Sequence, residues 1–419
     1  MATNREGTAV STRRPESDFW KYWTGQTISQ LGSSITLFAL PLLVYKLTGS
    51  AINLGITTAV EFLPYLLFGL LLGAWTDRVD RKRMMITADV ARALIIASIP
   101  LQAFFGSLSV WWIYAVGFTH STLTICFESG QFAAIPSLVN QDDLVTANGR
   151  IQASYSGASI VGPLLAGLLV TVLSIPTLLL FDALSFVIST CSLALIKTSF
   201  NADKREKKLS TSIGRDMIEG LRYVFSHPVL RNISIMMALV NFVAITESAQ
   251  LVLFAKERLQ ANDAQVSLLY SAGSVGVVVL SLAAGPLRKR WPFSKVALGA
   301  LMAMGGFITI LAFTRWYWTA LILYACISGL GILFNINTSS LRQAIVPNAM
   351  LGRVMSIASV LASSASPLGS LIGGFAVGWT KNVALIYEII GVLVFLIPLA
   401  FSFTALGHAE RYLPQEEAE

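Results

Sequence analysis

Twelve long apolar runs constrain the fold of this chain more than any other feature of its sequence. A helix needs about 20 mostly apolar residues to cross the hydrocarbon core of a bilayer. Stretches of this kind lie near residues 20–46, 51–76, 84–106, 109–134, 150–173, 176–197, 229–255, 262–287, 295–314, 316–340, 351–378 and 382–406. The sequence therefore predicts an all-α membrane protein with twelve transmembrane helices.

The composition supports a membrane-embedded chain. Hydrophobic residues make up 54% of the 419 residues and charged residues 13%, against roughly 45–50% and 25% in an ordinary soluble protein. Because so few charged groups could not cover a soluble surface, the bilayer is the expected partner. The net charge of +7 gives no reason to expect a nucleic-acid partner. Residues 1–18 lack the short apolar core of a signal peptide, so we expect the first run to be retained.

The sequence offers no pattern for an enzyme, a metal site or a cofactor. Cys126, Cys191 and Cys326 lie within apolar runs and have no metal-ligand spacing, and the three histidines are scattered. No Gly-Lys dipeptide occurs, so the chain has no Walker A loop for ATP. We expect no catalytic residue, bound metal or cofactor.

Polar segments divide the chain into two halves. The longest charged connection follows the sixth apolar run. The predicted organisation is a cytoplasmic N-tail, a first six-helix half, a cytoplasmic linker, a second six-helix half and a cytoplasmic C-tail, over residues 1–18, 19–197, 198–228, 229–406 and 407–419.

The basic residues predict the orientation. If the N-terminus is inside, 25 of the 30 Lys and Arg residues lie in cytoplasmic segments, as the positive-inside rule requires. We therefore expect a multi-pass protein of the plasma (inner) membrane with both termini in the cytoplasm.

The two halves also contain a weak internal repeat. A Gly-Arg-Ile triplet at 149–151 precedes a helix rich in small residues with Pro163, and Gly-Arg-Val at 352–354 precedes a similar helix with Pro367. Small residues let membrane helices approach closely. Repeats of this kind place a binding site between halves that rock against each other.

The segment GAWTDRVDRK at 73–82 resembles the signature of the major facilitator superfamily between its second and third helices. The matching residues are Gly73, Asp77, Arg78, Arg81 and Lys82, while Asp80 replaces the usual second glycine. The fifth run resembles the Gly-Pro motif of that superfamily's drug exporters, with Gly157, Gly162, Pro163 and Gly167. The first run and LRQAIVPNAMLGRVMSI are similar to the branch that holds macrolide-efflux and siderophore-exporter proteins.

The resemblance implies two pseudo-symmetric halves and a cytoplasmic gate. Asp77 would accept hydrogen bonds from free amides at the start of helix 11, near Arg353, and would favour the outward-facing state. We assign to this gate Gly73, Asp77, Arg78, Arg81, Lys82, Asp89, Arg92 and Arg353. Asp89 and Arg92, one turn apart, are expected to pair beside this loop. A topology signal alone would explain the bases but not Asp77.

The sequence departs from the superfamily pattern in two places. Helix 4 lacks the arginine that many exporters carry, so the proton-relay role of that residue cannot be transferred to this chain. The loop after helix 8 has no acid equivalent to Asp77, so the gate is asymmetric between the halves.

Polar residues inside the apolar runs are the candidate functional groups, because a charge at the centre of a spanning helix costs about 2.5–3.5 kcal/mol. His120, Thr124, Glu128 and Gln131 share one face of helix 4. The proton-coupling candidates are Glu61, His120, Glu128 and Glu247, although an interhelical hydrogen-bond network is the alternative. Asp182 and Glu388, nearer to outer helix ends, are expected to be solvated or paired with interfacial bases.

Polar stripes on helices 1, 4, 7 and 10 indicate a central cavity, since these helices line it in the superfamily. The candidate cavity residues are Gln26, Gln30, Thr124, Phe127, Gln131, Asn241, Tyr324 and Asn335. Few charges and several aromatic rings favour an amphipathic small-molecule substrate over a sugar or a small ion.

We therefore predict a proton-coupled secondary transporter, acting as a monomer, that exports a drug-like, macrolide-like or siderophore-like molecule. A lipid or lysolipid transporter of the same fold is the alternative. A channel, or the membrane part of an ATP-driven permease, fits the twelve-helix repeat less well.

Overall fold

The computed structural model describes residues 16–76, 79–139, 143–201 and 213–412. This part of the chain is helical and contains no strand. It forms two six-helix halves, which confirms the predicted fold class. Among the described residues, ten helices are long and apolar enough to cross a membrane, and α4 and α5 complete the set of twelve spans.

The first half contains six uninterrupted helices. They are α1 (Glu16–Thr48), α2 (Ala51–Thr76), α3 (Arg81–Phe104), α4 (Val110–Leu138), α5 (Leu144–Leu169) and α6 (Ile175–Leu195). Local sequence explains where several begin: the side chains of Asp80, Ser109 and Ser174 each accept a hydrogen bond from a backbone amide of the first turn. These caps satisfy amides that have no partner within the helix.

The second half begins after the amphipathic helix α7 (Ile213–Ser226). Its helices are α8 (Pro228–Ala249), α9 (Leu251–Glu257), α10 (Asp263–Arg290), α11 (Phe293–Phe313), α12 (Tyr317–Ile345), α13 (Asn348–Ser364), α14 (Ser366–Thr380), α15 (Val383–Ser402) and the 3-10 helix η3 (Ala405–Tyr412). The predicted seventh and eleventh spans are each divided in two, at Gln250 and at Ala365.

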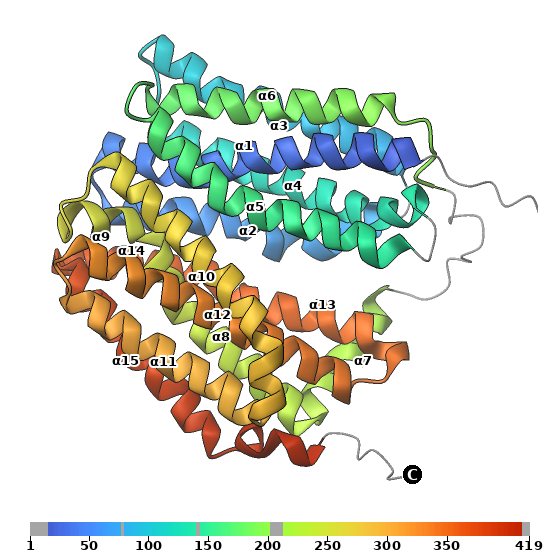
Figure 1. Ribbon diagram of the computed structural model, residues 1–419, viewed down its shortest axis with the longest axis vertical. Coiled ribbons are helices and arrows are strands. Elements are labelled where there is room, and N and C mark those ends of the chain that lie inside the picture. The colour runs from blue at the N-terminus through green and yellow to red at the C-terminus, as the bar shows by residue number, and fades with distance from the viewer. Residues whose placement is uncertain (1–15, 77–78, 140–142, 202–212, 413–419) are drawn as a thin grey trace, which may run out of the picture.

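The two halves lie side by side and are joined at one end (Figure 1). We call the end where α1 begins the terminal end and the other the opposite end. Between the halves, α2 packs against α14 and α5 packs against α10. These are equivalent pairs, because each joins the fifth helix of one half to the second helix of the other. The helices diverge toward the terminal end (Figure 1).

Candidate functional site

A polar cleft runs through the first half, made of two adjoining cavities of about 250 Å³ and about 330 Å³. Both cavities are lined by Ser33, Leu37, His120 and Thr124, so α1 and α4 form their common walls. The first cavity extends toward α2 and the second toward α3 and α5.

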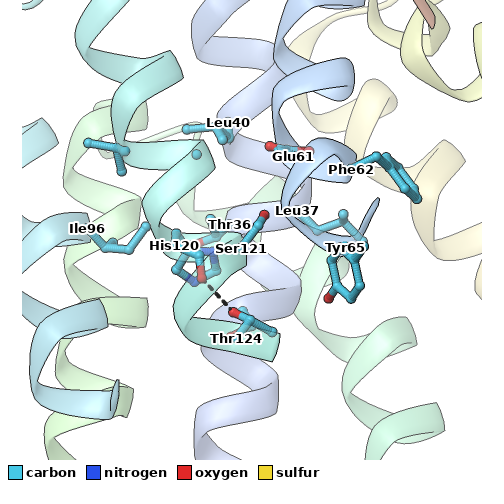
Figure 2. A pocket seen from close by; sticks show the side chains of 13 residues that line it. Thr36, Leu37, Leu40, Glu61, Phe62, Tyr65, Ile96, His120, Ser121 and Thr124 are labelled. Atoms are coloured by element: carbon cyan, nitrogen blue, oxygen red, sulfur yellow. Dashed lines mark hydrogen bonds between the residues drawn. The ribbon is translucent and has the colours of Figure 1, made fainter. Parts of the chain in front are cut away.

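Glu61 lies in the first cavity, where it points from α2 toward α4 (Figure 2). It lies opposite Gly117 of α4, where an added Cβ would be in ordinary van der Waals contact with Glu61 Cγ at 3.6 Å. Phe62 and Tyr65 add aromatic surface on the same helix. The cavity therefore combines one carboxyl group with mainly apolar walls.

The second cavity contains most of the polar residues predicted on helices 1 and 4. Its lining includes Gln26, Gln30, Thr124, Phe127, Glu128, Gln131, His120, Arg92 and Tyr155. The four residues on one face of helix 4 therefore do meet in one cavity. Glu128 is exposed to this space, while Gln131 Nε2 donates to the Tyr155 hydroxyl at 2.5 Å and joins α4 to α5.

A buried ion pair lies in the wall of this cavity. Arg92 and Asp89 of α3 pair with each other at under a tenth exposure. The Arg92 guanidinium lies 4.4 Å from the ring centroids of both Phe127 and Phe186, a cation–π arrangement. Ser189 donates to Asp89 at 2.6 Å and Gln26 donates to Ser189 at 2.8 Å. The pair is thus held by α1, α4 and α6.

The expected pair of Asp89 and Arg92 forms, and it lies inside the first half. Arg92 is eleven residues beyond the first residue of α3, roughly 16 Å at 1.5 Å per residue, so its place in a gate stays a prediction. It also supplies a buried cation next to the helix-4 face that lacks an arginine of its own. Arg92 and Arg342, which are among the 25 bases expected in cytoplasmic segments, are buried in the bundle.

Asp182 is also not solvated, contrary to the expectation from its position near a helix end. Its side chain is fully buried. It accepts hydrogen bonds from Thr36 at 2.5 Å, Ser33 at 3.2 Å and Ser185 at 3.3 Å. Three hydroxyl donors satisfy this carboxyl group and join α6 to α1, and it forms no ion pair within the described part of the chain.

The bases of the signature loop bind within the first half. Arg81 Nη1 donates to the Phe200 carbonyl at 3.1 Å, and Lys82 Nζ donates to the Ile196 carbonyl at 2.5 Å. Cations at the carbonyl end of a helix are favourable, so Lys82 stabilises the end of α6, while Arg81 binds the segment that follows α6. Asp77 and Arg78 lie outside the described residues. Gly73 lies within α2 and Arg353 within α13.

The second half holds its polar residues in the packing between helices. Asn241 donates to the Ala362 carbonyl at 2.8 Å and joins α8 to α13. Tyr324 is buried against Gly273 of α10, and Asn335 is exposed. Glu247 is buried, and one carboxyl oxygen lacks a hydrogen-bond partner among the described residues. The Tyr387 hydroxyl donates to the Glu247 backbone carbonyl at 2.6 Å.

Contacts between the halves gather at the opposite end. Lys46, at the end of α1, pairs with Asp263, at the start of α10. Lys256 binds the same carboxylate at 2.6 Å. Gln250, fully buried, donates to the Ala51 carbonyl at 2.8 Å. No sequence spacing could have identified these partners, because the two sides of the contacts made by Lys46 and Gln250 lie 217 and 199 residues apart.

The Gly-Pro motif of helix 5 permits close helix packing both between the halves and within the first half. A Cβ at Gly167 would lie 1.8 Å from Ser267 Oγ of α10, and one at Gly162 would lie 2.4 Å from Ser34 Cβ of α1. Gly157 faces open space, and Pro163 is buried one residue beyond Gly162. Two of the three glycines therefore permit close helix packing.

A further cavity, of about 280 Å³, separates the halves beyond these contacts. It is lined by Tyr65, Leu66 and Gly69 of α2 and by Ser359, Val360, Ser363 and Ser364 of α13. Two six-helix halves, joined at one end and with a cavity between them beyond that junction, form the architecture of a transporter of the major facilitator superfamily.

The chain belongs, within this superfamily, to the transmembrane secretion effector family, whose family model matches residues 14–417. It is 27% identical over 357 residues to macrolide efflux protein A of Streptococcus pyogenes, covering 84% of this chain and 88% of that protein. It is 26% identical over 357 residues to the multidrug efflux pump Tap of Mycolicibacterium fortuitum, covering 82% and 85%.

The fold also matches the solved structure of a point mutant of the nucleoside transporter NupG, with a TM-score of 0.77. The match covers 92% of this chain and 98% of that one, at 13% sequence identity. These proteins are transporters rather than enzymes, so this multi-pass membrane protein is a transporter as well.

Proposed function

We propose that this protein exports an amphipathic small molecule from the cell in exchange for protons, by alternating access. The observation that carries the proposal is the cleft of the first half, where Glu61, His120 and Glu128 meet aromatic and aliphatic walls. Such a site offers charge and hydrogen bonds to one end of a substrate and apolar surface to the other. The efflux names of the two relatives support the same substrate class.

The orientation forms part of the proposal. The terminal end, with most of the lysines and arginines, would face the cytoplasm across the plasma membrane. The contacts through Lys46 and Gln250 then close the outer side, and the cavity between α2 and α13 lies toward the inner side. This arrangement suits substrate entry from the cytoplasm or the inner leaflet.

In the outward-facing state, the two halves would be in contact at the terminal end instead of the opposite end. The outer contacts through Lys46 and Gln250 would open, and α2 and α13 would close at the terminal end. Asp77, which follows α2, would then accept hydrogen bonds from the first turn of α13, near Arg353. Amides at a helix start carry a partial positive charge, so an acid is suited to this role.

Proton coupling is assigned to the carboxyl groups that face or border the cleft. A carboxylate in an apolar environment is unstable unless it is paired, hydrated or protonated. Protonation of Glu128 from the outer side would release substrate, and loss of the proton to the cytoplasm would allow the next substrate to bind. Arg92, in the same cavity, would stabilise the ionised form without leaving its partner Asp89.

Transport in proteoliposomes tests this function, with a radiolabelled macrolide as the probe. We expect a pH gradient to drive its accumulation, and expect Glu128→Gln to lower that accumulation about tenfold or more while downhill exchange persists. Glu61→Gln should have a similar but smaller effect, because that residue lies at the other end of the cleft. Glu388→Gln, at a half-buried position of α15 that lines neither cavity, is the matched control.

Two results would reject the proposal. Accumulation that ignores the pH gradient and is unchanged in both variants would exclude proton coupling through the cleft. Movement of a spin-labelled lysolipid without movement of the macrolide would favour the lipid transporter instead.

A further inference from the structure

Helix α7 carries two apolar faces, and only one of them packs against the protein. On the first face, Val224 is buried in a cluster with Val346, Val354 and Ile357, which fixes α7 against α13. Tyr223 is partly buried against the same cluster. This face accounts for the attachment of α7 to the second half at the terminal end (Figure 1).

The second apolar face is exposed. Ile218, Leu221 and Phe225 are 68%, 42% and 42% exposed, and their spacing of three and four residues places them in one stripe. Glu219 and Arg222, also exposed, lie on the remaining side of the helix. The three sides of α7 are therefore a packed apolar side, an exposed apolar side and a polar side, in that order around the helix.

This arrangement suits a helix that lies at the surface of a bilayer. Only His227 separates α7 from α8, which enters the membrane at Pro228. Exposed apolar side chains continue along α8 at Ile235 and Leu239. The exposed stripe of α7 therefore lies at the level where the polar and apolar layers of the leaflet meet.

We propose that the stripe of Ile218, Leu221 and Phe225 rests in the bilayer leaflet at the terminal end, and that acidic phospholipid headgroups bind beside it. Arg222 and Arg231 are both exposed at this corner, and basic side chains next to an apolar helix face attract anionic lipids. Helix α7 packs against α13, and α13 faces α2 across the cavity between the halves. A contact between α7 and the leaflet therefore also connects the leaflet to α13. The proposal does not depend on the substrate or the coupling ion.

Spin labels on the full-length protein in liposomes test the proposal. Cys126, Cys191 and Cys326 are replaced by serine, and single cysteines are introduced as Ile218→Cys, Leu221→Cys and Phe225→Cys. Glu219→Cys and Ser226→Cys, on the exposed polar side of the same helix, are matched controls, so misfolding would affect both sets. We expect oxygen to collide with the first three labels more often than a water-soluble nickel complex does, and the reverse for the two controls.

The lipid composition then tests the headgroup. In liposomes with phosphatidylglycerol the first three labels should lie deeper than in phosphatidylcholine alone, and Arg222→Gln with Arg231→Gln should remove that difference. Nickel access to positions 218, 221 and 225 equal to that at 219 would overturn the membrane contact. Equal depth in both lipids would overturn the role of acidic headgroups. Neither result bears on macrolide transport, so a failure here is distinct from a failure of the proposed function.

Discussion

The two halves of the molecule share one helix arrangement but differ in how they hold buried charge. In the first half, Arg92 pairs with Asp89 between two phenylalanine rings. In the second half, Arg342 is equally buried, yet its Nη2 contacts the Met237 sulfur at 3.1 Å, and no ion pair to it exists within the described part of the chain. The two halves therefore repeat one helix arrangement but hold their buried arginines with different partners.

The packing itself is repeated closely. Gly162 of α5 lets that helix approach α1, and Gly369 of α14 lets it approach α8, the corresponding helix of the second half. Close helix packing depends on a glycine in each half, whereas the polar cleft is formed by residues of the first half only. We therefore expect glycine substitutions to lower stability similarly in both halves, and substitutions of buried arginines to lower it by different amounts.

The largest expected effect is the loss of the buried cation in the first half. Arg92→Gln leaves Asp89 charged and buried, which costs about 3–5 kcal/mol when a buried pair is broken from one side. Arg342→Gln should cost less, because no carboxylate is left behind. Thermal unfolding of both purified variants in detergent measures the difference.

The double variant Arg92→Gln, Asp89→Asn is the control for this interpretation. It should recover part of the stability lost in Arg92→Gln, since no uncompensated charge remains. Equal losses in Arg92→Gln and Arg342→Gln would contradict the asymmetry between the halves.

The next largest effect on stability is expected at the glycines that permit close packing in both halves. A Cβ at Gly162 would lie 2.4 Å from Ser34 Cβ, and one at Gly369 would lie 2.0 Å from the Phe242 carbonyl oxygen. We expect Gly162→Ala and Gly369→Ala each to destabilise the protein by about 1–3 kcal/mol, as overpacking does. Gly157→Ala, with nothing within 4 Å, should be neutral or stabilising by up to about 1 kcal/mol, because alanine favours helix. Melting curves that do not separate Gly157→Ala from the other two would reject this account.

The smallest effect on stability is expected where the halves meet at the opposite end. The Lys46 side chain is 48% exposed in its pair with Asp263, and Asp263 keeps its second partner, Lys256, when Lys46 is replaced. Lys46→Gln should therefore change the free energy of unfolding by only about 0–1 kcal/mol. The same change should open the opposite end and increase labelling of a cavity cysteine, Leu37→Cys, by an impermeant thiol reagent from that side. Asp77→Asn should increase labelling from the terminal side instead. Unchanged labelling in both variants would exclude these residues as gates.

Much of the site could be predicted because residues spaced by three or four positions lie on the same face of a helix. His120, Thr124, Glu128 and Gln131 recur every three or four residues, and all four line one cavity. The spacing of Asp89 and Arg92 likewise predicted their pair. It could not predict that the pair faces α4 and α6 inside the first half, because rotation and depth of a helix depend on its neighbours. Asp182 was misjudged for a related reason: its three hydroxyl partners come from residues on two helices that pack only in the folded protein.

The sequence by itself determined that the chain lies in a membrane, how many helices span it, that they form two halves, and the family. These follow from the length of apolar runs and from short local motifs. Tertiary structure decided the partners of the charged groups. Arg92 lies beside the helix-4 face, Lys46 pairs with Asp263 across the halves, and Lys82 binds the end of α6. An ion pair depends on the distance between two charged atoms. In a bundle of long helices, packing sets that distance for residues far apart in the chain.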